Sequence, residues 1–314
     1  MFSVIMPVYN GEKFIDDAIN SVCAQTYDNW ELVIVNDGSK DNTADVLKKY
    51  EINSQIKIIH QENGGVSVAR NTAISASKGE YIVFLDADDV WHTNHLEVMN
   101  ELITEYPDAG LYATFTRTEL VNGGIIEECN FFKNKPDVVY LEDFFKAYYN
   151  DKSAMIFNIT TACFSRKALD ITGLFPVGCA IGEDLELSLR VAAYFPVVLC
   201  KKATGTYKKT NSTATKDISF DPDWKFFDTV NSLYSDSRIV SDKKENLKKI
   251  MQWFTMRKVR HLVICGRRKE AFSAYRDIGN DPKLLKDKLI TIAILLMPVF
   301  MVRKLFEVRW RGRA

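Results

Sequence analysis

The fold is decided by residues 2–39, which read FSVIMPVYNGEKFIDDAINSVCAQTYDNWELVIVNDGS. The two ends of this stretch, Phe2 to Val8 and Glu31 to Asn36, are short and rich in β-branched residues, a pattern that predicts strands. Between them, apolar residues recur at helical spacing from Phe14 to Val22. A strand, a helix and a second strand in this order predict a βαβ unit with parallel strands.

The same alternation continues through the first 116 residues. Further strands are expected at Ile56 to His60, Tyr81 to Asp86 and Gly110 to Phe115, and a helix is expected from Val68 to Ala76. We therefore predict an α/β fold in which helices flank a mostly parallel, Rossmann-like sheet.

The pattern is less regular after residue 116. It predicts a helix at Leu141 to Tyr149, a strand at Thr161 to Ser165 and a helix at Asp184 to Tyr194. Beyond about residue 216 the strand signal fades, and the remainder predicts helices. The expected domains are therefore 1–215, an α/β domain, and 216–314, a helical extension.

Composition supports this division. The 314 residues are 46% hydrophobic, which is enough for a large core and more than one domain. Residues 1–215 carry 19 Lys and Arg against 29 Asp and Glu, whereas residues 216–314 carry 22 against 12, so the two parts have net charges of −10 and +10. The six cysteines are dispersed and the N-terminus lacks the pattern of a secretion signal, so we expect a reducing, cytoplasmic location.

Polar clusters follow the predicted strands, and open α/β sheets bind ligands at this edge. Pro7 to Gly11 follows the first strand and Asn36 to Ser39 follows the second. Either cluster taken alone is more typical of an ordinary turn, with Ser39 or Asp41 as a helix cap.

The strongest chemical signal is Asp86-Ala87-Asp88-Asp89, at the exit of a predicted buried strand. Three carboxylates there repel one another and lose solvation, so a compensating cation is the natural explanation. Oxygen ligands favour Mg²⁺ or Mn²⁺. The alternative is a solvated acidic turn that caps a helix starting near Trp91. His92 and His95 are expected to be exposed residues of that helix and not ligands.

Glu183 and Asp184 open the predicted helix at 184–194. Carboxylates at this position are common helix caps, because they interact favourably with the free N–H groups and the dipole of the helix. Capping is the simpler interpretation of this pair taken alone.

Taken together, the ordered motifs resemble glycosyltransferase family 2, inverting enzymes with the GT-A fold. The resemblance covers about residues 2–215 and rests on the following segments: 4–10, Val-Ile-Met-Pro-Val-Tyr-Asn; 36–39, Asn-Asp-Gly-Ser; 63–71, from Asn-Gly-Gly to Ala-Arg-Asn; 86–89; and 182–184, Gly-Glu-Asp, with Arg190. The resemblance implies a nucleotide-sugar half at about 1–116 and an acceptor half at about 117–215.

The resemblance also implies roles for individual residues. The nucleotide, a UDP-sugar, would be bound by Pro7, Tyr9, Asp37, Arg70 and Asp86. The metal ion, Mn²⁺ or Mg²⁺, would be held by Asp88 and Asp86. The donor sugar and diphosphate would lie near Asp89, Trp91, Glu183 and Lys208.

Asp184 would be the catalytic base. It would take the proton of an acceptor hydroxyl as that oxygen attacks the anomeric carbon and inverts its configuration. One departure from the family pattern concerns the metal: where many relatives have Tyr-Arg-x-His, this chain has Tyr207-Lys208-Lys209-Thr210. Thr210 replaces a possible imidazole ligand, so the third protein ligand of the metal stays open.

The C-terminal tail, residues 289–314, combines an apolar run with basic residues. Leu289 to Val302 is apolar apart from Thr291 and contains Pro298, and Arg303 to Arg313 is rich in arginine. As one helix the run would cover roughly 21 Å, against about 30 Å of hydrocarbon in a bilayer. We expect peripheral association with the inner face of the cell membrane; packing on the protein's own core and an oligomer interface are the alternatives.

Other functions are less consistent with the sequence. A nucleotidyltransferase that makes a nucleotide-sugar would need a stronger phosphate-gripping loop than Asn10 to Lys13. A non-catalytic nucleotide-sugar-binding scaffold at the membrane would not need Asp184. A dehydrogenase would show GxGxxG after the first strand, and an acidic catalytic half opposes nucleic acid binding. The expected acceptor is a lipid-linked or growing saccharide in surface polysaccharide or glycan synthesis.

Overall fold

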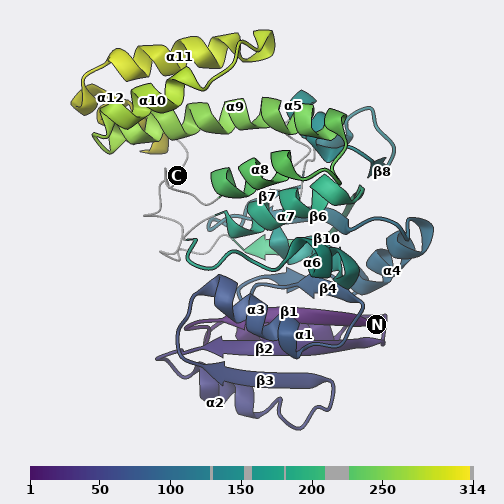
Figure 1. Ribbon diagram of the computed structural model, residues 1–314. Coiled ribbons are helices and arrows are strands. Elements are labelled where there is room, and N and C mark those ends of the chain that lie inside the picture. Colours follow the sequence, from purple (N-terminus) through teal and green to yellow (C-terminus); the bar gives the residue numbers. More distant parts are fainter. Residues whose placement is uncertain (128–129, 152–157, 180–181, 209–225, 312–314) are drawn as a thin grey trace. The chain divides into compact units, whose positions relative to one another are not determined.

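The computed structural model describes residues 1–127, 130–151, 158–179, 182–208 and 226–311 (Figure 1). For residues 306–311 it describes the backbone alone. The chain divides into two compact units, Met1–Thr213 and Ala214–Ala314. Each unit has an apolar core cluster of its own.

The first unit is built on one sheet, to which the described residues contribute ten strands. The strands are β1 Phe2–Val8, β2 Trp30–Asp37, β3 Ile56–Gln61, β4 Tyr81–Phe84, β5 Val90–Trp91, β6 Leu111–Glu119, β7 Ile125–Ile126, β8 Val138–Leu141, β9 Ala162–Ser165 and β10 Val197–Lys208. Their order is β3-β2-β1-β4-β9-β6-β10-β5, with β7 paired to β6 and β8 paired to β10.

Strand directions confirm the predicted α/β class. β1 runs parallel to β2 and β4, β2 to β3, and β6 to β10. β9 is antiparallel to both β4 and β6, and therefore joins the two parallel parts of the sheet. Pro7 lies in β1 beyond Ile5, the last residue of β1 that pairs with β4, so its missing N–H costs no bond on that side.

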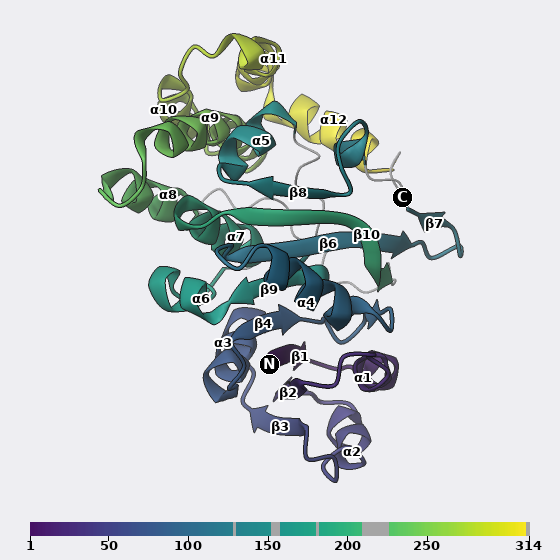
Figure 2. The ribbon, with the colours of Figure 1, turned by 90° about the vertical axis from the view of Figure 1, so that its right-hand side faces the viewer.

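Helices cover both faces of the sheet. The helices of this unit are α1 Ile15–Cys23, α2 Thr43–Lys48, α3 Val66–Ala76, α4 His95–Glu105, α5 Phe144–Asn150, α6 Arg166–Thr172 and α7 Glu183–Tyr194, with short 3₁₀ helices at Asn130–Phe132 and Ile159–Thr161. Figure 2 shows α1, α2 and α4 on one side of the sheet and α3 and α6 on the other.

The alternation of side chains along β1 explains these two layers. Phe2, Val4, Met6 and Val8 point to one face, because successive residues of a strand point to opposite faces. They share one core cluster with buried residues of α1, α2 and α4. On the other face, α3 packs against β1 and β2 through its small residues, Ala69 among them.

Two local predictions in the first unit need correction. The helix expected from Leu141 begins at Phe144, because Leu141 ends β8 and Asp143 caps the helix by accepting a hydrogen bond from the N–H of Lys146 at 3.0 Å. The long strand β10 was not predicted. Its apolar start passes into Lys201 and Lys202, where the register with β6 shifts twice, so the two-residue alternation is lost.

The second unit is helical in its described residues. Its helices are α8 Phe226–Ser235, α9 Ser241–Ile264, α10 Arg268–Arg276, α11 Leu285–Leu296 and α12 Val299–Arg311, with a 3₁₀ helix at Pro282–Leu284. The long helix α9 contacts each of the others. It ends at Ile264, and Gly266 just beyond it has a positive φ of 79° that lets the N–H of Arg267 reach the carbonyl of Leu262 at 2.8 Å.

The apolar run Leu289 to Val302 was predicted as one helix, and this prediction is wrong. Pro298 cannot continue a helix, and Met297 before it is extended, so α11 ends at Leu296 and α12 begins at Val299. Among the described helices, none combines the length and the apolar character needed to cross a bilayer.

Candidate functional site

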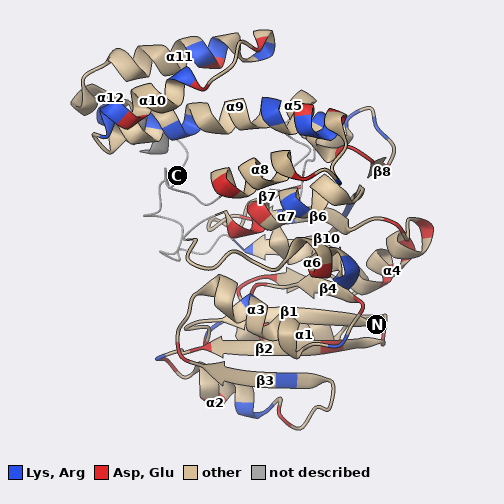
Figure 3. Cartoon of the chain, in the orientation of Figure 1, with Lys and Arg blue, Asp and Glu red and all other residues tan. Residues whose placement is uncertain are grey.

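The candidate site lies where β1, β2 and β4 end and α7 begins. Figure 3 shows Asp and Glu at the start of α7 and in the loop next to β4. The motifs that the sequence analysis selected all belong to this region: the ends of β1 and β2, the start of α3, the loop after β4 and the start of α7.

The loops after β1 and β2 are tied together. The N–H of Asn10 donates to Ser39 Oγ at 2.9 Å, and the N–H of Lys40 donates to Asn10 Oδ1 at 2.8 Å. Asn10 has a positive φ of 54°, a conformation that Asn tolerates better than most residues. Tyr9, just before it, is 47% exposed, so its ring is available for stacking.

Asp37 ends β2 and organises the loop before α3. Its Oδ1 accepts from Gln61 Nε2 at 2.7 Å and from the N–H of Gly64 at 2.9 Å, and its Oδ2 accepts from the N–H of Gly65 at 2.9 Å. A carboxylate oxygen accepts two hydrogen bonds, so Oδ2 keeps one free position. Gly38 is required here, because a Cβ would lie 2.8 Å from the backbone nitrogen of Asn63.

Arg70 connects the two acidic motifs. Its Nη2 lies 2.8 Å from Asp86 Oδ1 and its Nη1 lies 2.9 Å from Glu183 Oε1, although the two partners are nearly one hundred residues apart. The Arg70 side chain is 3% exposed and lies over the ring of Phe175, with 5.2 Å between the guanidinium carbon and the ring centroid. Arg70 therefore holds the loop after β4 and the start of α7 at one place.

Charge is balanced around this bridge. Burial alone would lower the pKa of Arg70, but Asp86, Glu183 and Asp184 raise it above its ordinary value. Burial, followed by the charge of Asp184, raises the pKa of Glu183, while Arg70 opposes this shift. Since Asp184 acts on both Arg70 and Glu183, it belongs to the same electrostatic cluster as Asp86.

Asp88 has no ion-pair partner among the residues that the structure describes. Burial first, and then the charge of Asp86, raise its pKa. A desolvated carboxylate next to a second carboxylate fits a divalent cation. The described residues hold no ready-made group of three His, Cys, Asp or Glu side chains for a metal, and Thr210 lies outside them.

Asp89, which ends the acidic motif, and Trp91 just after it are both buried. Asp89 is 1% exposed and accepts from Thr160 Oγ1 at 2.5 Å and from the N–H of Lys208 at 3.1 Å. Burial, and then the charge of Asp86, raise its pKa to about 8. Trp91 donates from Nε1 to the carbonyl of Thr160 at 2.7 Å. Their expected place near the donor sugar stays a prediction.

The expectation that His95 is exposed is wrong. His95 is fully buried, and its ring stacks on Trp91 with 4.1 Å between the ring centroids. Its Nδ1 lies 2.6 Å from Thr204 Oγ1 of β10. Burial, and then the charge of His92, lower its pKa to about 3, so the ring is neutral at physiological pH. Packing of α4 against β10 decides this burial, and the pairing with β10 was not visible in the sequence.

The start of α7 is shaped by its N-cap, Gly182, which has a positive φ of 83°. Gly182 makes no side-chain cap, and the Glu183 side chain turns to Arg70, so the capping interpretation does not hold for Glu183. Asp184 is partly exposed, and its Oδ1 accepts from the N–H of Leu185 at 2.7 Å. In the described part of the chain, no hydrogen-bond donor contacts its second oxygen, Oδ2.

Two further residues fix the loop before α7. Arg190 binds Glu186 on its own helix and donates to the carbonyls of Thr172 and Leu174. Asn71 exchanges two hydrogen bonds with the backbone of Phe175, at 2.9 and 3.0 Å. Asn71 and Arg190 belong to motifs of the sequence, but the motifs predicted no role for them, and no pattern in the sequence marks Thr160.

Lys208 ends β10 at the surface. Its Nζ pairs with Asp17 Oδ2 at 3.0 Å; Asp17 is exposed and Lys208 is half-buried. The residues that follow, including Lys209 and Thr210, lie outside the described part of the chain.

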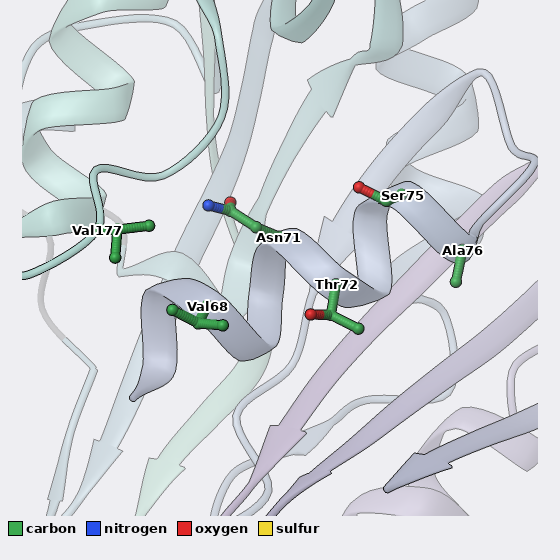
Figure 4. A pocket seen from close by; sticks show the side chains of 6 residues that line it. All are labelled: Val68, Asn71, Thr72, Ser75, Ala76 and Val177. Atoms are coloured by element: carbon green, nitrogen blue, oxygen red, sulfur yellow. The ribbon is translucent and has the colours of Figure 1, made fainter. Parts of the chain in front are cut away.

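A hollow also lies on the outer side of α3, away from the acidic cluster. Figure 4 shows Asn71, Thr72 and Ser75 along this helix with Val177 opposite; Val68 and Ala76 complete the lining. The hollow contains no carboxylate and no cationic side chain, so it offers no group for proton transfer or phosphate binding.

Comparison with known proteins gives a family match. Residues 3–171 match the sequence model of the family described as Glycosyl transferase family 2. The putative teichuronic acid biosynthesis glycosyltransferase TuaG of Bacillus subtilis is 42% identical over 107 residues, 33% of this chain and 42% of TuaG. WfgD of Escherichia coli, a UDP-Glc:alpha-D-GlcNAc-diphosphoundecaprenol beta-1,3-glucosyltransferase, is 38% identical over 127 residues, 40% of this chain and 49% of WfgD. The chain therefore spans less than half the length of these relatives.

Solved structures support the fold. TarS 1–349 of S. aureus, in complex with UDP-GlcNAc, aligns with a TM-score of 0.65 and 22% identity over 94% of this chain and 80% of TarS 1–349. The mannosyltransferase PcManGT of Pyrobaculum calidifontis, in complex with GDP-Man and Mn²⁺, aligns with a TM-score of 0.52 and 17% identity over 96% of this chain and 71% of that protein. At these identities the similarity shows the GT-A-like fold alone.

Proposed function

We propose a function on one premise, namely that the chain belongs to glycosyl transferase family 2, because more than half of its residues match the family. The proposed reaction is the transfer of a sugar from a nucleotide-sugar to an acceptor hydroxyl, with inversion at the anomeric carbon. The observation that carries the proposal is the Arg70 bridge, which brings Asp86 and Glu183 to one place. It thereby joins the proposed metal ligands to the proposed base.

The proposed donor is a UDP-sugar. Its base would stack on exposed Tyr9 and donate from a ring N–H to the free acceptor position of Asp37 Oδ2, with Pro7 shaping the end of β1. This support is geometric, since Tyr9 and Asp37 end neighbouring strands. Arg70 can take part through its Nε, which is buried and has no hydrogen-bond partner among the described residues.

The proposed metal is Mn²⁺ or Mg²⁺, held by Asp88 together with Asp86. Uncompensated charge at Asp88 supports this assignment. When bound, the ion would neutralise the negative charge that develops on the leaving diphosphate. Lys208 is proposed to contribute to the same task by leaving Asp17 for a phosphate oxygen, an exchange that costs little because Asp17 is exposed and the existing ion pair is partly solvated.

Asp184 is proposed as the general base. Its free Oδ2 accepts the proton of the acceptor hydroxyl, and the resulting oxygen nucleophile bonds to the anomeric carbon from the side opposite the diphosphate. The bond from that carbon to the diphosphate oxygen breaks, and the diphosphate leaves with the electron pair. Glu183 is held by Arg70 and fixes the position of Asp184 next to it.

The proposed acceptor is a lipid-linked or growing saccharide in bacterial surface polysaccharide or glycan synthesis. WfgD acts, by its name, on a sugar linked to diphosphoundecaprenol, which supports this class of acceptor. We propose that the reaction takes place at the cytoplasmic face of the cell membrane.

The test is a panel of UDP-, GDP- and other nucleotide-sugars with Mn²⁺ or Mg²⁺, scored for binding by calorimetry and for slow donor hydrolysis. We expect binding and hydrolysis of a UDP-sugar that depend on the metal. In the Asp184→Asn variant, hydrolysis or transfer is expected to fall by about 10³-fold while donor binding is kept, because a positioned base contributes about 10²- to 10⁴-fold.

The matched control is Asp242→Asn, an exposed carboxylate in the first turn of α9. Full turnover in Asp184→Asn would show that Asp184 is not the base. Release of pyrophosphate from a nucleoside triphosphate and a sugar phosphate would indicate a nucleotidyltransferase and not a glycosyltransferase. Donor binding by the wild type without turnover of any acceptor would indicate a nucleotide-sugar-binding protein without catalytic activity.

A further inference from the structure

The helix α11 has a second apolar face that its own unit does not cover. One face packs inward through Ile294 and Leu295, which belong to the core of the second unit. On another face, Leu285, Leu289, Ile292 and Leu296 are exposed, Leu289 by 60% and Leu296 by 65%. These four residues are called the α11 stripe below.

The spacing of the α11 stripe makes it continuous. Its members are separated by four, three and four residues, which places them in one row along a helix of 3.6 residues per turn. The row is about 16 Å long, at a rise of about 1.5 Å per residue. By this periodicity Ile294 lies on the opposite side of the same helix, and Leu295 lies about a quarter turn from the stripe. The stripe is therefore a surface in its own right and not the edge of the core.

Exposed apolar residues also occur on α12. Phe300 is 72% exposed and Leu305 is 53% exposed, whereas Val302 between them is fully buried in the core of the unit. Scattered exposed apolar residues are ordinary, but a continuous row such as the α11 stripe marks an interaction surface.

The positively charged side chains on the same helices indicate what kind of surface the stripe binds. Figure 3 shows Lys and Arg on α11 and α12. Lys286 is exposed and lies beside the stripe, and Arg303 and Lys304 are exposed next to Leu305. Residues 216–314 together carry a net charge of +10. An apolar row flanked by cations is complementary to an anionic lipid surface, and two copies of a unit with this charge would repel each other.

We propose that the α11 stripe docks on an anionic phospholipid bilayer. The apolar side chains enter the boundary between headgroups and acyl chains, while Lys286 beside the stripe meets the lipid phosphates. This docking involves residues of the second unit alone, so its test does not depend on the transferase reaction proposed for the first unit.

The experiment is co-sedimentation of the full chain with vesicles. One set is phosphatidylcholine containing about one third phosphatidylglycerol, and the other is phosphatidylcholine alone. The wild type is expected to bind the anionic vesicles about tenfold or more tightly than the neutral ones, and added salt should weaken this binding. The double variant Leu289→Gln/Leu296→Gln is expected to bind anionic vesicles about tenfold or more weakly than the wild type.

The matched control is Ile52→Gln, which removes an apolar side chain that is 93% exposed in the first unit. It should bind vesicles like the wild type. Both changes replace exposed residues, so the melting temperature should stay the same, and this measurement separates lost docking from lost folding.

Three outcomes would overturn the proposal. The first is equal vesicle binding by the wild type and the double variant at an unchanged melting temperature. The second is equal binding to neutral and anionic vesicles, which would remove the part assigned to the lysines. The third is a wild-type dimer in solution that the double variant converts to a monomer while vesicle binding is absent in both, which would make the stripe an interface between copies of this chain.

Discussion

The two units place their charges in different ways. In the described residues, the buried Asp, Glu, Lys and Arg side chains are Asp37, Arg70, Asp89 and Glu186, and all four lie in the first unit. The core cluster of the second unit is apolar, and its described ion pairs range from the surface pair of Arg267 with Glu270 to the partly buried pair of Arg260 with Asp287.

This contrast has a physical reason. A buried charge is costly unless fixed partners surround it, so it is found where its position matters for chemistry. A surface charge costs little and suits a partner that is met from solution. The first unit therefore holds its charges in fixed geometry, whereas the second presents them outward.

The largest effect on stability should come from breaking the Arg70 bridge. Arg70→Met leaves the largely buried Glu183 and the partly buried Asp86 without their cation, and should lower the free energy of unfolding by about 3–5 kcal/mol. Urea denaturation measures this change.

The matched variant in the second unit is Arg267→Met, which breaks the exposed pair with Glu270 and should cost about 1 kcal/mol or less. A similar loss in both variants would remove the contrast between the units.

The next effect is a pH dependence that arises from His95. Its pKa is lowered to about 3 in the folded state by burial, against about 6.5 when unfolded. Between these values the unfolded state binds the extra proton, so stability is fully present above pH 6.5 and falls as the pH drops toward 3. Near pH 5 the expected loss from this residue is about 2 kcal/mol relative to pH 7.

The His95→Phe variant keeps an aromatic ring against Trp91 but cannot titrate, so its stability should change less between pH 7 and pH 5 than that of the wild type. The exposed His60 offers the control, and His60→Gln should leave the wild-type slope in place. Parallel slopes in the wild type and His95→Phe would mean that His95 is not buried in its neutral form.

A smaller effect is expected in the second unit at the end of α9. Gly266→Ala forces a side chain into the left-handed region at φ of 79°, and should cost about 1 kcal/mol in free energy of unfolding. Ser273→Ala, on the exposed face of α10, should change it by about 0.5 kcal/mol or less. If Gly266→Ala is as stable as the wild type, the turn that ends α9 differs from the one described.

The smallest effect on stability is expected at Lys208. Lys208→Gln breaks the partly solvated pair with Asp17 and should change the free energy of unfolding by about 0.5 kcal/mol or less. The same variant should raise the donor KM by about tenfold, because a lost charge-assisted hydrogen bond to phosphate is worth about 1.5–3 kcal/mol. An unchanged KM would show that Lys208 does not contact the diphosphate. The variant to compare is Asp17→Asn, which removes the carboxylate that pairs with Lys208 in this structure.

The sequence predicted the first unit better than the second. Strands β1 to β4 and helices α1, α3 and α7 were predicted close to their observed positions, because each has a clear period of its own side chains. The missed strand β10 depends on pairing with β6 and on two register shifts, and such long-range pairing leaves little local pattern. In the tail the local apolar pattern was identified, but the effect of Pro298 on it was underestimated.

For the candidate site, the sequence supplied the residues and their order along the chain. It could not show that Arg70 lies between Asp86 and Glu183, because the three residues are brought together only when α3, β4 and α7 pack. It also could not show that Asp89, Trp91 and His95 are buried, since burial depends on β10 and on Thr160, which belong to other parts of the chain.

By itself, the sequence determined the α/β alternation, the acidic motif after β4, the carboxylate pair that opens α7 and the opposite charges of the two parts. These are properties of neighbouring residues, and local periodicity and composition report them directly. The tertiary structure alone decided which charges are paired, which are buried and which apolar face of α11 stays exposed. Those properties depend on contacts between segments far apart in the chain, whose free energy is gained only when the segments pack together.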